Sequence, residues 1–226
     1  MASLQDALNE RKKLREVYNT IADCWSHLRA TPWPEVVEFS KSIDKGVVLD
    51  IGCGNGRNMI PFLSKNIKCV GFDFSRKMIK EAKKFLAKKG FKTSLVVADV
   101  LELPFKENTF NAIIFSRSLH HIPTTQLRTE TLKNVGKLLK PGGKMLLTVW
   151  RRYYPRFIGD YFTSLFDKKF EFGDVYKKWS YGGRVYKRYF HLYSQEELEN
   201  EIYGAGLHVT KMRISEGNII SISERS

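Results

Sequence analysis

The sequence predicts an α/β fold in which seven strands form one mostly parallel, doubly wound sheet that ends in an antiparallel hairpin. Short apolar runs alternate with helical patterns from residue 47 to residue 150, which is typical of a parallel sheet. A glycine-rich turn follows the first of these runs, as in folds that bind nucleotides at the end of a strand. Two strand patterns, 207–213 and 218–224, then end the chain with no helix between them.

The elements are expected in the following order along the chain. The strands are predicted at residues 47–51, 68–73, 93–98, 110–115, 144–150, 207–213 and 218–224. The helices are predicted at residues 4–22, 34–42, 56–65, 75–90, 127–139 and 194–203. Ser75 is the expected N-cap of the helix that Gly90 ends, and Ser194 forms a capping box with Glu197.

The length and composition favour one globular domain. The chain has 226 residues, of which 42% are hydrophobic and 27% charged. Residues 1–43 are expected to form a helical lid, and residues 151–190 a basic, aromatic insertion between the fifth strand and the last helix. No run of about 18 uncharged apolar residues is present, so no membrane span is predicted. The charged N-terminal segment lacks the apolar region of a secretory signal, and a cytoplasmic location is expected.

The formal net charge of +14 is concentrated in two segments. Residues 75–92 contain eight basic residues and one acidic residue, and residues 151–193 contain ten basic and four acidic residues. The second segment also holds 15 of the 29 aromatic residues. Basic side chains interleaved with aromatic rings suit phosphates and unstacked bases, so RNA is a candidate partner. The alternative is a solvated helix face for the first segment and a packed lid for the second.

The cysteine pattern predicts neither disulfides nor a metal site. Cys24, Cys53 and Cys69 are too few for a disulfide framework, and Cys24 and Cys69 are expected to be small buried residues. The sequence contains no C-x-x-C pair and no H-x-x-x-H or H-E-x-x-H motif, so no metal ligands are assigned.

The most specific motif is the strand and glycine turn of residues 47–57, VVLDIGCGNGR. Glycines let the backbone turn tightly and approach a ligand closely. The dinucleotide fingerprint would need glycine where Arg57 stands, and the lysine of a P-loop is absent. Asp73 ends the second strand, where a carboxylate can accept both ribose hydroxyls, and Asp99 follows the third, where it can accept from an adenine amino group. The pattern therefore predicts a site for an adenosine without a pyrophosphate.

The successive motifs LDIGCGNG, GFDFS, ADVLELPF and LKPGGKMLL resemble those of the class I S-adenosylmethionine-dependent methyltransferases, over residues 47–150. The resemblance implies a single methyltransferase domain of the Rossmann-like class I fold, with S-adenosylmethionine as its cofactor. It implies that Phe74 flanks the adenine. The expected cofactor-binding residues are Tyr18, Asp50, Gly52, Gly54, Asn55, Gly56, Asp73, Phe74, Asp99, Val100 and Ser116.

Segments outside these motifs resemble a narrower family. Residues 17–39 (VYNTIADCWSHLRATPWPEVVEF), 118–124 (SLHHIPT) and 188–193 (RYFHLY) occur in the order found in the tRNA wobble-uridine methyltransferases. That family esterifies the carboxylate of 5-carboxymethyluridine, so the resemblance implies this reaction with tRNA as the substrate. One departure is that the segment before RYFHLY is shorter than in eukaryotic members. Another is that Lys177-Lys178 stand where Val-Pro is usual.

A carboxylate nucleophile needs no general base, because a carboxyl group with a pKa near ~4 is already ionised at neutral pH. It needs cationic or hydrogen-bonding groups that hold one oxygen toward the methyl group. The side chains that could provide this are Arg29, His120, His121, Arg188 and His191. One of the two neighbouring histidines is expected to be a structural hydrogen-bond donor, and His121 is the one assigned to the site, so the catalytic candidates are Arg29, His121, Arg188 and His191. Arg29 could equally hold the methionine carboxylate of the cofactor.

The third strand, residues 93–98, is expected at an edge of the sheet and carries no charge to protect it. An unprotected apolar edge predicts that another chain adds a strand there. The wobble-uridine family works with a small activator protein, often zinc-binding, so the resemblance implies the same kind of partner.

Two other functions are compatible with the sheet motifs. A small-molecule methyltransferase of the quinone or sterol kind would have a closed apolar pocket and no need of the basic insertion. An inactive cofactor-binding subunit would carry damaged glycine or acidic motifs, and these motifs are intact in the chain.

Overall fold

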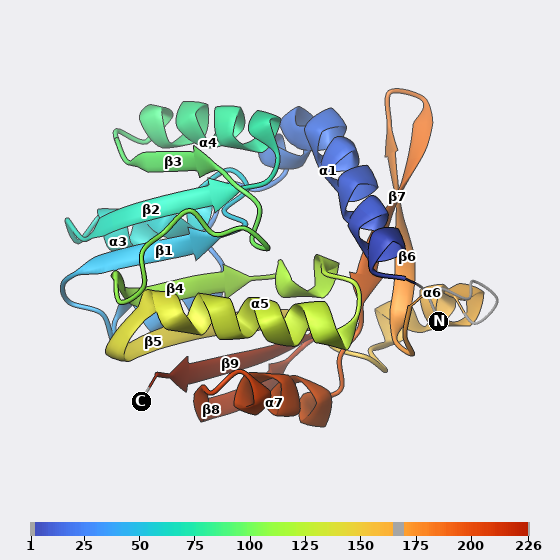
Figure 1. Ribbon diagram of the computed structural model, residues 1–226. Coiled ribbons are helices and arrows are strands. Elements are labelled where there is room, and N and C mark those ends of the chain that lie inside the picture. The colour runs from blue at the N-terminus through green and yellow to red at the C-terminus, as the bar shows by residue number, and fades with distance from the viewer. Residues whose placement is uncertain (1–2, 165–169, 226) are drawn as a thin grey trace.

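The computed structural model describes residues 3–164 and 170–225, and it contains the predicted seven-stranded sheet (Figure 1). The strand order is β3-β2-β1-β4-β5-β9-β8. Strands β1 to β5 are parallel to one another, whereas β9 is antiparallel to both β5 and β8. The doubly wound α/β sheet and its C-terminal antiparallel hairpin are therefore confirmed, and β3 is an edge strand as predicted.

The strands and helices have the following bounds. The strands are β1 (Val47–Ile51), β2 (Lys68–Asp73), β3 (Ser94–Val97), β4 (Phe110–Ser116), β5 (Leu139–Trp150), β6 (Asp174–Tyr181), β7 (Arg184–His191), β8 (His208–Ser215) and β9 (Asn218–Glu224). The α-helices are α1 (Leu4–His27), α2 (Pro34–Ser40), α3 (Ile60–Leu63), α4 (Arg76–Lys88), α5 (Thr125–Leu138), α6 (Ile158–Ser164) and α7 (Gln195–Gly204). Short 3₁₀ helices are η1 (Arg57–Met59), η2 (Leu119–His121) and η3 (Pro155–Phe157).

Two apolar cores lie on the two faces of the sheet. On one face, α5 and α7 pack their apolar side chains, such as Leu132 and Leu198, against strand residues such as Ile113 and Leu147. On the other face, α2, α3 and α4 pack against a second set that includes Ile114. Because β1, β4 and the second half of β5 are covered on both faces, their sequences are mostly apolar, which is why the sequence identified them.

Two helix predictions differ from the structure. The expected helix 56–65 is shorter: it consists of η1 and α3, because the loop still turns at Gly56 and Pro61 restricts the first turn of α3. The expected helix 4–22 is longer, since α1 continues to His27 and buries Ser26 in what was expected to be a loop. Its start has a capping box between Ser3 and Asp6.

The expected basic insertion contains η3, α6 and a separate two-stranded sheet, β6 and β7. Gly182 and Gly183, with φ of 57° and 71°, form the turn between these strands. In Figure 1 this β6–β7 hairpin stands beside α1, at the end of the sheet to which the parallel strands point. Within the described residues, no helix is both long enough and apolar enough to cross a membrane.

Candidate functional site

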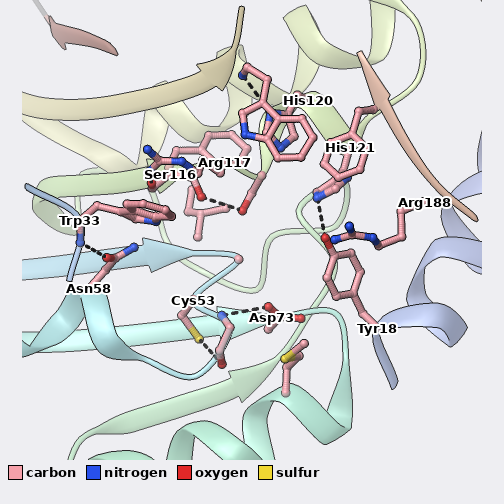
Figure 2. Close-up of a pocket in the computed structure, with 18 of the residues that line it drawn as sticks. Tyr18, Trp33, Cys53, Asn58, Asp73, Ser116, Arg117, His120, His121 and Arg188 are labelled. Atoms are coloured by element: carbon pink, nitrogen blue, oxygen red, sulfur yellow. Dashed lines mark hydrogen bonds between the residues drawn. The ribbon is translucent and has the colours of Figure 1, made fainter. Parts of the chain in front are cut away.

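A cavity of about 380 Å³ lies at the carboxyl ends of β1, β2 and β4 (Figure 2). The strands contribute the glycine turn after β1, Asp73 at the end of β2 and Ser116 at the end of β4. Helix α1 and the residues after it add Tyr18 and Arg29, and β7 adds Arg188. Ligands of open α/β sheets bind at this position, and the volume is in the range of small-molecule sites.

The glycine turn exposes backbone to this cavity. Gly52 and Gly54 have φ of 65° and 55°, in the left-handed region that favours glycine. A Cβ atom on Gly52 would lie 2.3 Å from the Ser118 hydroxyl oxygen, and one on Gly54 would lie 2.8 Å from the Trp25 ring. Neither position can carry a side chain without displacing a cavity residue, so only glycine lets Ser118 and Trp25 pack this closely on the turn.

Asp73 presents a partly satisfied carboxylate to the cavity. Its Oδ2 accepts a hydrogen bond from the Gly54 amide at 3.1 Å, and its Oδ1 accepts one from the Ser75 amide at 2.9 Å. Each oxygen retains a lone pair, so the group can still accept from two ribose hydroxyls. Burial raises the pKa of Asp73 to about 6, against the lowering effect of the two amides.

The predicted adenine partner, Asp99, is engaged by α1. The Arg11 guanidinium forms an ion pair with the Asp99 carboxylate, which also accepts from the Leu101 amide. Arg11 is buried and lines the cavity beside Phe74, whose ring centroid is 5.8 Å from the guanidinium carbon. Phe74 and Val100 also line the cavity as expected, which gives it an apolar end next to Asp73.

Tyr18 and His121 form a hydrogen-bonded pair within the cavity (Figure 2). His121 Nδ1 lies 2.9 Å from the carbonyl oxygen of Tyr189 and must donate its proton there, because a carbonyl only accepts. In the neutral ring Nε2 then accepts from the Tyr18 hydroxyl at 2.9 Å. Burial lowers the pKa of His121 to about 3, so the ring is neutral at physiological pH and positions Tyr18.

His120 also lines the cavity, and its ring accepts a main-chain hydrogen bond where the sequence led us to expect a donor. Its Nδ1 accepts a hydrogen bond from the Trp150 amide at 3.1 Å. Burial and the neighbouring His121 lower the pKa of His120 well below its ordinary value, so this ring is also neutral.

A row of alternating arginine and tryptophan side chains follows one wall of the cavity. Each guanidinium carbon lies between 3.6 and 5.7 Å from the centroid of a neighbouring ring, within range of cation–π attraction. In order, this Arg–Trp row consists of Arg188, Trp179, Arg29, Trp25, Arg57, Trp33 and Arg117. All of them except Trp179 line the cavity.

The positive charge of this row is only partly balanced. Arg117 pairs with Glu35 at 2.6 Å. Among residues 3–164 and 170–225, no carboxylate forms an ion pair with Arg29, Arg57 or Arg188. Burial and the nearby charges of Arg29 and Arg117 lower the pKa of Arg57 to about 10, so it still carries its charge at neutral pH. Arg57 and Arg188 are buried and Arg29 is half-buried, and guanidinium groups without an ion-pair partner that face a cavity indicate an anionic ligand.

The cavity gathers most of the residues that the sequence predicted. Those that line it are Tyr18, Arg29, Gly52, Gly54, Asp73, Phe74, Val100, Ser116, His121 and Arg188. The predicted residues that do not line it are Asp50, Asn55, Gly56, Asp99 and His191.

Each of these five residues has another environment. Asn55 donates to the carbonyl of Arg29 at 2.7 Å, and a Cβ on Gly56 would meet the Leu86 side chain at 2.8 Å. Asp50 is 1% exposed, and burial with the nearby charge of Asp73 raises its pKa to about 8. Asp99 pairs with Arg11, and His191 is buried between two carboxylates outside the cavity.

The cavity contains three arginines that were not predicted from the sequence as site residues: Arg11, Arg57 and Arg117. Arg11 could have been found, because it occupies the same face of α1 as Leu14 and Tyr18, where a basic residue requires an explanation. Arg57 was noted in the sequence only because it stands where the dinucleotide fingerprint would need a glycine.

Comparisons with known proteins show which proteins this chain is similar to. Residues 48–143 match the family model described as "Methyltransferase domain". The tRNA (carboxymethyluridine(34)-5-O)-methyltransferase ALKBH8 of Mus musculus is 36% identical over 66% of this chain, a match that covers 21% of that protein. The tRNA (carboxymethyluridine(34)-5-O)-methyltransferase of Schizosaccharomyces pombe is 27% identical over 96% of this chain and 98% of its own length. The chain thus spans about a fifth of the mouse relative and nearly all of the yeast one.

Solved structures share the fold. A SAM-dependent methyltransferase of Methanosarcina mazei superposes with a TM-score of 0.74 at 19% identity, covering 86% of this chain and 98% of that one. A methyltransferase of Haloferax volcanii, in complex with the Trm112 methyltransferase activator, superposes with a TM-score of 0.67 at 16% identity, covering 93% and 96%. These likenesses confirm the predicted class I fold.

The raised pKa of Asp73 predicts how cofactor affinity depends on pH. Ribose hydroxyls donate to the ionised carboxylate, so binding of S-adenosylhomocysteine should weaken as pH falls through about 6. Calorimetric titration should give about tenfold weaker binding at pH 5 than at pH 7.5. Asp73→Asn should bind roughly 10- to 150-fold more weakly at pH 7.5, with little further change at pH 5.

The control for this series is Asp44→Asn, because Asp44 is an exposed carboxylate that pairs with Lys65 away from the cavity. It should behave as the wild type does. Equal wild-type affinities at pH 5 and pH 7.5 would contradict the role given to Asp73.

Proposed function

We propose that this chain, a class I S-adenosylmethionine-dependent methyltransferase, esterifies the carboxylate of 5-carboxymethyluridine at the wobble position of tRNA. The observation that carries the proposal is the set of unbalanced guanidinium groups in the cavity, beside a neutral Tyr18–His121 pair. Such a set suits an anionic nucleophile that needs orientation and no deprotonation. The curated relatives named for this reaction supply the identity of the anion.

The residues of the cavity fit the cofactor. Gly52 and Gly54 offer backbone where a side chain would collide, and Asp73 keeps two lone pairs for the ribose. Phe74 and Val100 form an apolar surface for the adenine. When bound, S-adenosylmethionine supplies a methyl group on a positively charged sulfur, so that a nucleophile can attack the methyl carbon in line and the sulfur can leave as a neutral thioether.

The two unpaired arginines nearest to Trp179 have separate roles in this proposal. Arg29 stacks on Trp25 at 4.3 Å, and Trp25 covers the glycine turn, so Arg29 would hold the methionine carboxylate of the cofactor. Arg188 lies next to Tyr18 on the hairpin side of the cavity, where it would hold one oxygen of the substrate carboxylate (Figure 2). This division separates the two roles that the sequence left open for Arg29.

The Tyr18–His121 pair would orient the substrate without exchanging a proton. His121 cannot serve as an acid, since its Nδ1 proton is committed to the Tyr189 carbonyl. Burial raises the pKa of Tyr18, so its hydroxyl stays protonated and retains free lone pairs for a donor on the substrate or on Arg188. Nothing in this arrangement would remove a proton from a hydroxyl or amine substrate, which favours a carboxylate.

The proposed tRNA partner would contact the basic segments that flank the cavity. The β6–β7 hairpin carries Lys177, Lys178, Arg184 and Lys187 together with Arg188, next to the cavity. These charges suit the phosphates that neighbour a base entering the cavity. A cytoplasmic location remains an expectation from the sequence.

The proposed reaction predicts a base-labile product. Incubation with methyl-labelled S-adenosylmethionine should label tRNA that contains 5-carboxymethyluridine. Mild alkali should release the label as methanol, because only an ester is hydrolysed under those conditions. Arg188→Ala should lower labelling at least about 100-fold, since it removes a charge-assisted hydrogen bond that positions the nucleophile.

The matched control is Arg213→Ala, which removes a half-exposed arginine that pairs with Glu38 outside the cavity, and it should retain full labelling. Arg29→Ala should mainly weaken S-adenosylhomocysteine binding. Alkali-stable label, or label in lipid extracts and none in tRNA, would contradict the proposal, and the latter would favour a small-molecule methyltransferase.

An activator protein on strand β3 is part of the proposed function. β3 is an edge of the sheet, and its Val97 side chain is 47% exposed. The methyltransferase of Haloferax volcanii that shares this fold was solved with the Trm112 activator. A small protein of that type would add a strand to β3 and cover its apolar side chains.

If the activator binds at β3, a lysine placed on that edge of the sheet should disrupt the complex, whereas a lysine on the opposite edge should not. Val97→Lys should abolish co-purification with a co-expressed Trm112-type activator, because a lysine opposes strand addition. Ile214→Lys is the control, since Ile214 is 45% exposed on β8, the opposite edge. Loss of the complex in both variants or in neither would contradict a specific interface on β3.

A further inference from the structure

Strand β7 has two faces with different surroundings. Side chains alternate along a strand, and Arg188 and Phe190 on one face line the cavity. Tyr189 and His191 on the other face are fully buried in a polar cluster at the base of the hairpin. The contacts that hold Tyr189 and His191 in place therefore also hold Arg188 in place.

His191 is the centre of this cluster. Its Nδ1 lies 2.8 Å from Asp174 Oδ1, on the paired strand β6, and its Nε2 lies 2.8 Å from Glu197 Oε1, on α7. A carboxylate can only accept, so both ring nitrogens must donate and the ring must carry both protons. A neutral ring would turn a nitrogen lone pair toward a carboxylate oxygen.

Each carboxylate has further donors. Asp174 Oδ1 also accepts from the Tyr189 hydroxyl at 2.6 Å, and Glu197 Oε2 pairs with Arg152 at 2.7 Å. Arg152 in turn donates to the Leu192 carbonyl, which follows β7 directly. The contacts join β6, β7, α7 and the end of β5.

The other charged groups around His191 come from the neighbouring helix α5, from α7 and from the segment before β6. Arg128 on α5 is fully buried and pairs with Glu201 at 2.8 Å and with Glu171 at 2.9 Å. Glu201 also accepts from the Tyr193 hydroxyl at 3.0 Å.

The described cluster thus holds four carboxylates, on Glu171, Asp174, Glu197 and Glu201, against two arginines, Arg128 and Arg152. A protonated His191 brings the charges closer to balance. Burial lowers the pKa of His191, but the hydrogen bonds to Asp174 and Glu197 outweigh it and raise the pKa overall. Within the described residues, no group of His, Cys, Asp and Glu side chains is arranged to hold a metal ion.

We propose that His191 is a positioning residue: as an imidazolium between Asp174 and Glu197, it fastens the β6–β7 hairpin to α7 and thereby holds Arg188 in the cavity. A two-stranded hairpin is marginally stable by itself, so its placement depends on such attachments. Removing the proton would turn a ring-nitrogen lone pair toward one carboxylate oxygen and take a positive charge out of a cluster that holds four carboxylates, so the base of the hairpin would loosen. His191 does not line the cavity and contacts no substrate in this proposal.

The direction of the pH effect follows from the raised pKa. The stabilisation is complete below the ordinary histidine pKa of about 6.5 and is lost as pH rises through the higher value in the folded protein. The Asp73 carboxylate acts at the opposite end of the pH range, so the two effects can be separated.

The direct test is the protonation state of His191 in the whole protein, measured by NMR of ¹⁵N-labelled histidine rings. At pH 7 the ring of His191 should show two protonated nitrogens and should titrate above 6.5, while His120 and His121 stay neutral. A neutral His191 ring at pH 7 would overturn the proposal. This result does not depend on which substrate is methylated.

The second test separates positioning from general loss of folding. His191→Gln should lower the hydrogen-exchange protection factors of β6 and β7 at pH 6.5 to the values that the wild type shows only at alkaline pH. It should lower kcat about 10- to 100-fold, while the affinity for S-adenosylhomocysteine stays within about twofold. His208→Gln, at an exposed position on β8, should change neither quantity.

The effect on kcat rests on the proposed function, whereas exchange and cofactor binding do not. If no substrate is methylated, the NMR and exchange results still decide the role of His191. Unchanged exchange in β6 and β7 of His191→Gln would overturn it. Equal losses of cofactor affinity and hairpin protection would also overturn it, because they would indicate a general structural role.

Discussion

The cavity depends on the attachment of the β6–β7 hairpin to the central sheet. The parallel strands supply the cofactor side of the cavity, but Arg188 and Phe190 come from a separate two-stranded sheet. That sheet is held by apolar contact, with the Phe190 and Trp150 rings stacked at 4.1 Å, and by the hydrogen bond from His121 to the Tyr189 carbonyl. The buried ions around His191 add the third attachment. Because these groups come from distant segments, the substrate side forms only when the whole chain is folded.

The distribution of charge divides the cavity into balanced and unbalanced parts. Next to the expected adenine site, Arg11 is neutralised by Asp99, and at the far end of the Arg–Trp row Arg117 is neutralised by Glu35. Between them, no carboxylate in the described part of the chain forms an ion pair with Arg29, Arg57 or Arg188. A cavity with this pattern attracts anions at its centre, where the proposed reaction brings a methionine carboxylate and a uridine carboxylate together.

The sequence predicted the parts of this fold that depend on local signals. The apolar strands are covered on both faces, and the glycine turn needs left-handed backbone at Gly52 and Gly54, so each left a pattern in a few consecutive residues. The role of His191 left none, since its partners Asp174 and Glu197 come from a strand and a helix whose packing the sequence does not reveal. For the same reason the ion pair between Arg11 and Asp99, 88 residues apart, was missed.

The central claim is that the cavity recognises a carboxylate by its charge, and competitive binding of anticodon stem-loop RNA tests it most directly. In the presence of S-adenosylhomocysteine, RNA with 5-carboxymethyluridine should bind at least about tenfold more tightly than the same RNA with the neutral amide or methyl ester. Arg188→Ala should remove this preference while leaving the affinity for the neutral RNAs unchanged. Equal affinity of the wild-type protein for the charged and neutral RNAs would contradict the account.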